Sequence, residues 1–195
     1  MSSTSVPTNY AAGEVLPGLW VGNLMSVYNL TRLIQHSNEN KVVVVTVISV
    51  LSNPNLISMA TKALEEQRRL QNDDTIITSV NHIVIPLKDT VHSEFKSILP
   101  SALSAIDEAL LFGHHHCSDK EDYHHNSQRR ICLVHCAKGE SRSVAIIAAY
   151  LLTRHSHAFT TFDKALRHIR TVRPQALPNI GFSVVLRQLE RQLNH

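Results

Sequence analysis

The segment that most constrains the fold is a short polar stretch, residues 134–143 (VHCAKGESRS), between two apolar runs. The run Ile131–His135 is typical of a buried strand, and the run that begins at Val144 is typical of a buried helix. A strand, a tight loop and a helix in this order direct several backbone N–H groups toward one point. The helix N-terminus adds positive partial charge there. The sequence therefore predicts an anion site of the size of a phosphate group.

Four kinds of residue in this loop suit phosphate chemistry. Cys136 lies at the start of the loop, where the helix N-terminus and nearby cations favour the thiolate. Arg142 brings a planar guanidinium that can bind two phosphate oxygens at once. Gly139 allows the tight turn, and the hydroxyls of Ser141 and Ser143 are expected near the sulfur. The alternative is a buried cysteine and a surface arginine at this spacing by coincidence.

The loop resembles that of a known enzyme family. Residues 135–143 match the His-Cys-x-x-Gly-x-x-Arg-Ser/Thr loop of the cysteine-dependent protein tyrosine phosphatase superfamily, and the continuation through 149–151 is similar to its dual-specificity protein phosphatases of the small atypical type. The Pro-Gly-Leu-aromatic run at 17–22 and the segment 173–182 also look like this family. The resemblance extends from about Val15 to Glu190 and leaves out an N-terminal tail and an internal insertion.

The resemblance, together with the chemistry of these side chains, implies a role for each site residue. Cys136 would attack phosphorus and form a phosphocysteine, and Ser143 would ease the later departure of the sulfur. The loop amides and the Arg142 guanidinium would hold the phosphate oxygens. His135 and Asn179 are expected to orient the loop without touching the substrate. The predicted phosphate-binding residues are Ala137, Lys138, Gly139, Glu140, Ser141 and Arg142.

Asp89 is the candidate general acid, and then the base for the water that breaks the intermediate. The family places this Asp shortly after a strand that ends in Pro and an apolar residue, and Ile85–Asp89 (IPLKD) matches. The gap from Asp89 to Cys136 is longer than usual in the family, and the insertion accounts for the excess. A residue that only caps a turn is the alternative role for Asp89. The competing carboxylates are Asp73, Asp74, Glu94 and Asp107.

The remaining pattern alternates strands and helices. Apolar runs predict strands at Val42–Val50, buried on both faces, and at Ser79–Leu87. Helical spacing covers 56–64, 95–110 and 144–152, followed by a helix capped by Thr160 and a last helix opened by Pro178–Asn179. This order predicts a single α/β domain with a mostly parallel central sheet flanked by helices, like that of protein tyrosine phosphatases. The carboxyl ends of parallel strands share one edge, so Asp89 and Cys136 are expected to meet there.

We expect a flexible tail at 1–13 and a catalytic domain at 14–195, interrupted by an inserted loop at 113–130. This insertion is polar and rich in His, with no apolar periodicity, and is expected to be exposed. Its His and Cys residues could bind a transition metal, but their spacing matches no structural zinc pattern. We therefore expect no metal and no cofactor, since backbone dipoles and Arg142 supply the positive charge. The His and Cys residues of the insertion are His114, His115, His116, Cys117, His124 and His125.

The cysteine count and the charge exclude some classes of protein. Three Cys residues do not build a disulfide framework and fit a reducing compartment. Cys132 is expected to be a core residue, because four residues of strand separate it from Cys136 by about 13 Å. Cys117 could reach Cys136, but nothing in the sequence positions it. The net charge of +3 is too small to indicate nucleic-acid binding. No apolar run is long enough to span a membrane, and no leader segment is evident.

The resemblance implies phosphorylated proteins as partners, with phosphotyrosine and phosphoserine or phosphothreonine as substrates. We expect no nucleic-acid or membrane partner and a cytosolic, or cytosolic and nuclear, location; the oligomeric state stays open. Glu140 beside Lys138 argues mildly against phosphoinositides and RNA 5′-phosphates. The alternatives are a catalytically weak phosphoprotein-binding scaffold, a metal-binding regulatory module built on the His-rich segment, and an enzyme of arsenate or sulfur transfer. A scaffold would be marked by a missing Cys, Arg or Asp.

Overall fold

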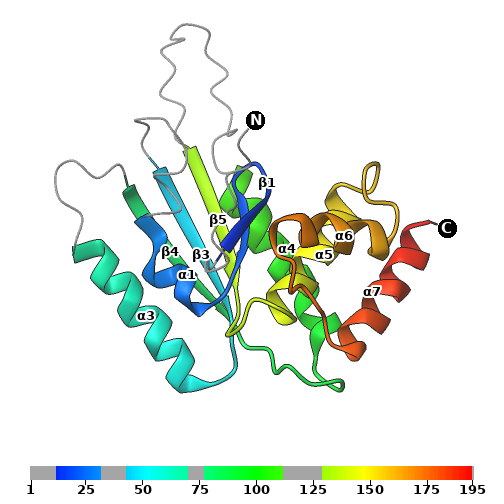
Figure 1. Cartoon of the computed structure of the whole chain (residues 1–195), viewed down its shortest axis with the longest axis horizontal. Coiled ribbons are helices and arrows are strands. Elements are labelled where there is room, and N and C mark those ends of the chain that lie inside the picture. Colours follow the sequence, from blue (N-terminus) through cyan, green and yellow to red (C-terminus); the bar gives the residue numbers. More distant parts are fainter. Residues whose placement is uncertain (1–11, 32–42, 70–76, 112–128, 195) are drawn as a thin grey trace, which may run out of the picture.

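A computed structural model describes residues 12–31, 43–69, 77–111 and 129–194. Their core is a five-stranded sheet with the order β1-β2-β5-β3-β4. β1 is antiparallel to β2, and the pairs β2–β5, β5–β3 and β3–β4 are parallel (Figure 1). The prediction of a mostly parallel sheet is therefore confirmed. The strands are β1 (Ala12–Leu16), β2 (Leu19–Gly22), β3 (Val43–Val50), β4 (Ile77–Ile85) and β5 (Arg129–His135).

Helices cover both faces of the sheet (Figure 1). On one face lie α1 (Leu24–Tyr28) and α3 (Pro54–Arg69). On the other face lie α4 (Phe95–Leu111), α5 (Arg142–Arg154), α6 (Phe162–Val172) and α7 (Ile180–Leu193). β3 is buried from both sides, as predicted: Val45 and Val47 belong to the α1/α3 side of the core, and Ile48 and Val50 to the side of α4–α7.

The parallel strands bring the two predicted motifs to one edge of the sheet. β5 ends at His135 and continues directly into the Cys136 loop, and β4 ends at Ile85, just before Leu87 and Asp89. β3 lies between β4 and β5 and is in register with both, which sets the distance between these two strand ends. The expected meeting of Asp89 and Cys136 at one edge is confirmed.

The structure differs from the predicted helix start in one place. Thr161, not Thr160, caps α6, and its side chain accepts a hydrogen bond from the backbone N–H of Lys164. Thr160 instead accepts from the side-chain ammonium of Lys164. Both threonines have the chemistry of a cap, but the helix must begin at Phe162 to place that ring in the core, where it is 2% exposed.

Some predictions fall on residues that the structure does not describe. The tail before Ala12, the polar loop at 71–74 and the His-rich residues from Gly113 to Gln128 lie outside the described ranges. β1 begins at Ala12 and β5 at Arg129, each two residues inside the segment expected to be tail or insertion. Within the described part of the chain, no helix has the length and apolar character needed to cross a membrane.

Candidate active site

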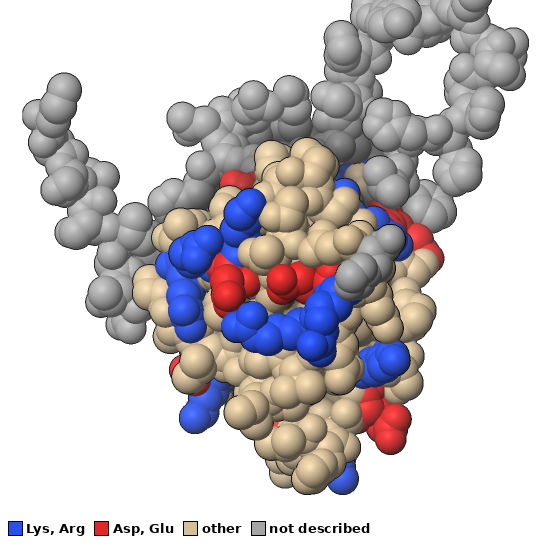
Figure 2. All heavy atoms as spheres, turned by 90° about the vertical axis from the view of Figure 1, so that its right-hand side faces the viewer, with Lys and Arg blue, Asp and Glu red and all other residues tan. Residues whose placement is uncertain are grey.

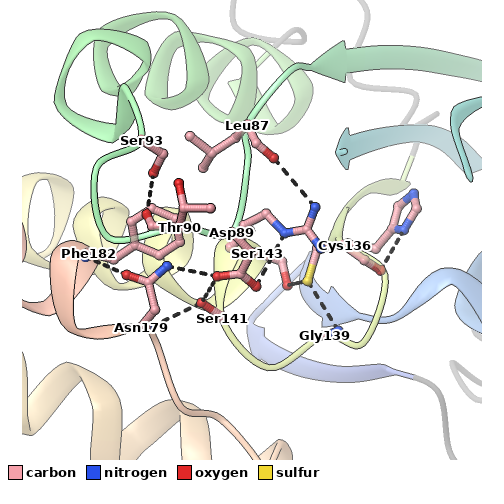
Figure 3. A network of polar contacts seen from close by, with 12 residues as sticks. Leu87, Asp89, Thr90, Ser93, Cys136, Gly139, Ser141, Ser143, Asn179 and Phe182 are labelled. Atoms are coloured by element: carbon pink, nitrogen blue, oxygen red, sulfur yellow. Dashed lines mark hydrogen bonds and ion pairs between the residues drawn. The ribbon is translucent and has the colours of Figure 1, made fainter. Parts of the chain in front are cut away.

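The loop after β5 encloses the sulfur of Cys136. This side chain is 1% exposed, and its Sγ accepts hydrogen bonds from the Gly139 N–H at 3.2 Å and the Ser143 hydroxyl at 3.4 Å (Figure 3). Gly139 has a φ of +69°, and a Cβ there would lie 2.6 Å from the carbonyl oxygen of Gly22. A turn of this shape therefore requires glycine.

The surroundings of Cys136 act on its pKa in opposite directions, and the net result is a lowered pKa. Burial raises it, because a thiolate loses hydration. Hydrogen bonds from the Ser143 hydroxyl and backbone, the positive charge of Arg142 and the Gly139 N–H lower it. The loop therefore favours the thiolate in a nearly closed site.

We expect Gly139→Ala to lower the free energy of unfolding by about 1–3 kcal/mol and to reduce activity. Alanine is strained at a positive φ. Its Cβ would also collide with the Gly22 carbonyl, which belongs to β2 and cannot easily move. Urea unfolding measures the first effect. The control is Lys138→Ala in the same loop, at an exposed side chain, which should change stability by less than about 0.5 kcal/mol. Equal stabilities of the two variants would contradict this account.

Asp89 lies across from this loop and contacts three of the residues singled out from the sequence. Its Oδ1 accepts hydrogen bonds from the Ser141 hydroxyl at 2.7 Å and from Asn179 Nδ2 at 2.8 Å (Figure 3). Its Oδ2 lies 3.5 Å from Nε of Arg142. Arg142 Nη1 also donates to the carbonyl of Leu87 at 3.4 Å. The guanidinium therefore links the Asp89 loop to the Cys136 loop.

The position of Ser141 differs from the expectation. Its hydroxyl does not reach the sulfur: it donates to Asp89 and accepts from the backbone N–H of Asn179 at 3.0 Å. For the same reason Ser141 makes no side-chain cap on α5, although it holds the cap position. Asn179 in turn caps α7 through Oδ1, which accepts from the Phe182 N–H. Ser141 and Asn179 thus hold the Asp89 carboxylate against the end of the loop.

A cleft of about 640 Å³ opens above Cys136 and Asp89. Among the competing carboxylates, Asp107 lies on α4 in an ion pair with Arg154 at 2.8 Å. Glu94 precedes α4 and accepts a hydrogen bond from the hydroxyl of Ser97 in the first turn of that helix. Neither lines the cleft, whereas Asp73 and Asp74 lie outside the described residues. The lining residues are Asp89, Cys136, Ala137, Lys138, Glu140, Ser141, Arg142, Arg170, Pro174, Gln175, Ala176 and Leu177.

The outer side of the loop is held by Arg173, which the sequence indicated only as a helix end. This side chain is 3% exposed, and it donates from Nε to the Gly139 carbonyl at 3.0 Å and from Nη2 to the Lys138 carbonyl at 2.6 Å. The N–H of Leu177 donates to the Glu140 carbonyl at 2.7 Å. Three successive loop carbonyls are therefore bound by one segment, residues 173–179, which we call the loop brace.

His135 begins a hydrogen-bonded chain on the α1/α3 face of the sheet. Its Nδ1 contacts the Cys136 carbonyl at 3.3 Å, so Nδ1 carries the proton and Nε2 accepts in the neutral ring. Ser49 Oγ, at 2.6 Å, therefore donates to His135 Nε2 and accepts from Nε2–H of His82 at 2.8 Å. The chain fixes the His135 ring, as was expected of an orienting residue. Ser49 and His82 were not found from the sequence.

We expect the protein to lose stability as the pH falls from about 6.5 to about 4. Burial lowers the pKa of His135 to about 4, so the unfolded chain binds a proton in this window that the folded chain does not. The contribution of His135 to the free energy of unfolding is about 3 kcal/mol. It is present in full above the pKa of the unfolded chain, near 6.5, and is lost progressively as the pH falls to about 4. Urea unfolding at several pH values, compared with His135→Gln, isolates this part. The same pH dependence in both proteins would show that His135 is not responsible.

The other described cysteine, Cys132, is buried in β5 and, like Cys136, is free. Burial alone raises its pKa. The prediction of a core residue is confirmed. Cys117 lies outside the described residues. In the described ranges no group of three or more His, Cys, Asp or Glu side chains could hold a metal ion. The metal-binding alternative rests on the His-rich segment, most of which those ranges leave out.

The fold and this site together define a protein tyrosine phosphatase-like α/β protein. The sequence profile described as "Dual specificity phosphatase, catalytic domain" matches residues 52–192. The chain therefore belongs to the dual-specificity phosphatase family, and the resemblance stated above, to its small atypical members, is confirmed.

Curated relatives and solved structures agree with this assignment. Mouse dual specificity protein phosphatase 22 is 25% identical over 182 residues, which are 93% of this chain and 75% of that protein. Dual specificity protein phosphatase 1 of Arabidopsis thaliana is 46% identical over 61 residues, only 31% of this chain and 29% of that protein. The crystal structure of DUSP15 matches with a TM-score of 0.60 at 25% identity and covers 94% of each chain.

Proposed function

We propose that this protein hydrolyses phosphate monoesters on phosphotyrosine and on phosphoserine or phosphothreonine of proteins, without a metal ion, through a phosphocysteine. The observation that carries the proposal is the Cys136 sulfur, held by the Gly139 N–H and the Ser143 hydroxyl with a lowered pKa. It opens to a cleft that Asp89 and Arg142 also line. Membership of a protein phosphatase family supports phosphorylated proteins as substrates.

In the first step the Cys136 thiolate attacks phosphorus, so an S–P bond forms as the P–O bond to the substrate breaks. The loop N–H groups at the start of α5 and the Arg142 guanidinium stabilise the charge on the phosphoryl oxygens. Asp89, in its protonated form, gives its proton to the leaving oxygen. Arg142 already lies next to Asp89, so the acid and the phosphoryl-binding group are held together.

In the second step Asp89, now a carboxylate, takes a proton from water. The water oxygen bonds to phosphorus while the S–P bond breaks. The Ser143 hydroxyl, 3.4 Å from Sγ, donates a hydrogen bond to the departing thiolate. The loop brace keeps the loop in one shape through both steps, because it binds the carbonyls on the outer side of the loop.

The test is detection of the intermediate. The protein is mixed with an aryl phosphate and excess chelator and quenched in acid, and the peptide that contains Cys136 is analysed by mass spectrometry. We expect one added phosphoryl group on Cys136, because rapid denaturation of the site stops the second step before the S–P bond breaks. Asp89→Asn should accumulate more of it, since the second step also needs Asp89. Turnover that stops on addition of the chelator, or turnover with no phosphopeptide in either protein, would contradict the proposed mechanism.

A further inference from the structure

We propose that four exposed apolar side chains beside the cleft bind apolar residues that flank the phosphorylated residue of a protein substrate. We call them the apolar rim: Val91, Leu177, Ile180 and Val184. The inference rests on the proposed function, because the rim matters to a substrate whose phosphate enters the cleft.

The rim is exposed although its side chains are apolar. The exposed fractions are 52% for Val91, 68% for Leu177, 70% for Ile180 and 50% for Val184. Single exposed apolar residues are common on protein surfaces, whereas a group of them marks an interaction site. The other large exposed apolar side chains in the described ranges, Met25, Met59, Val84 and Leu193, belong to α1, α3, β4 and the far end of α7.

Backbone contacts hold the rim together at one side of the cleft. Ile180 and Val184 are one turn apart on α7, so their side chains are neighbours. Gly181 lies so close to the Asp89 loop that a Cβ would be 2.2 Å from the carbonyl oxygen of Val91. Leu177 itself lines the cleft, and its N–H is bound to Glu140. The rim is therefore continuous with the cleft wall and spans both the start of α7 and the loop that carries Asp89.

The part of the rim formed by Leu177, Ile180 and Val184 lies in an uncharged stretch, which favours an apolar partner. Residues 177–186 contain no charged side chain. Figure 2 shows Lys and Arg gathered across the middle of the face formed by α6 and α7, whereas the lower part, at the height where α7 begins in Figure 1, is mostly tan. A peptide chain whose phosphate reaches Cys136 must pass the mouth of the cleft, and Leu177 lies there. Apolar side chains next to the phosphorylated residue would lose water against the rim.

The experiment compares two phosphotyrosine peptides of equal length and charge, with leucines or serines on both sides of the phosphotyrosine. We expect wild-type kcat/KM to be about tenfold higher for the leucine peptide, the effect of burying roughly one apolar side chain. In Ile180→Glu this preference should fall to about twofold or less. Glutamate suits the first position of a helix, so α7 should keep its structure. Met59→Glu on α3, also at an exposed apolar side chain, is the matched control and should keep the tenfold preference.

Three results would contradict the role of the rim, and a parallel assay tests the proposed function separately. Equal kcat/KM for the two peptides in the wild type, or a full preference in Ile180→Glu, would overturn the role of the rim. So would a wild-type dimer that Ile180→Glu dissociates, because the rim would then contact a second copy of the chain. Turnover of an aryl phosphate is measured in parallel. Its presence without a peptide preference removes only this inference, whereas its absence in folded wild type removes the proposed function as well.

Discussion

Cys136→Ser is expected to reduce turnover of an aryl phosphate on the order of 10⁴-fold or more, the scale found when a nucleophile is removed. The change replaces sulfur by oxygen and leaves the hydrogen-bond donors of Gly139 and Ser143 in place. A serine hydroxyl does not ionise in this environment, because the contacts that favour a thiolate cannot overcome the much higher pKa of an alcohol. The loop should still bind phosphate.

Activity with chelator present, together with binding of a non-hydrolysable phosphonate, measures the two effects separately. The matched control is Cys132→Ser in β5, which makes the same atomic change at the other buried, free cysteine of the described residues. It places a hydroxyl in the core and should cost stability, but kcat should stay within a few fold of the wild type. Substantial turnover by Cys136→Ser would exclude a phosphocysteine. A loss in Cys132→Ser as large as that in Cys136→Ser would point to a folding defect.

Asp89→Asn is expected to slow hydrolysis of a phosphoserine peptide by about 10²- to 10⁴-fold, the usual contribution of a general acid. The loss in kcat/KM should be much smaller for an aryl phosphate with a nitro-substituted phenol, because that leaving group departs in the first step without a proton. Asparagine can keep an oxygen facing Ser141 and Asn179, so the Asp89 loop and the affinity for the substrate should change little.

The measurement is kcat/KM, which reports the first step alone, for both substrates with wild type, Asp89→Asn and Asp107→Asn. Asp107 is a suitable control, because it is ion-paired to Arg154 on another part of the surface. Equal losses for both leaving groups would mean that Asp89 acts by holding Arg142 and Ser141, not by giving a proton. Unchanged kcat/KM for the phosphoserine peptide would mean that another residue is the acid.

The parts of the site that sequence reasoning found are those encoded locally. The residues of the Cys136 loop are consecutive. The order of residue types in this stretch therefore indicates the end of β5, the turn at Gly139 and the start of α5. Asp89 was found by a different argument: it matches the place where the resembled family has its acid, after a strand that ends in Pro and an apolar residue. The rule that parallel strands end at one edge then served as a check. Both arguments use short stretches of chain and one general rule about sheets.

The parts that were missed depend on side chains that meet across the fold. Arg173 binds carbonyls 34 and 35 residues away, and Ser49 binds a histidine 86 residues away. A single sequence does not reveal such pairs, because they follow from strand register and helix docking. Ser49 is a polar residue in an otherwise apolar strand, and this was the available signal for the hydrogen-bonded chain to His82. Thr160 and Thr161 were indistinguishable as caps until the position of Phe162 in the core was known.

The loop brace also sets an order of events while the chain is being made. A growing chain on the ribosome exposes Cys136 before Arg173 and α7 have been synthesised. Without Arg173 and the N–H of Leu177, the carbonyls of residues 138–140 lack the hydrogen bonds that bind them in the folded protein. The conformation of the loop is then not fixed from its outer side. We therefore expect the cysteine of a half-made chain to behave as an ordinary thiol, which oxidants attack slowly. The reactive thiolate would then arise among the last steps of folding, when the C-terminal helix docks.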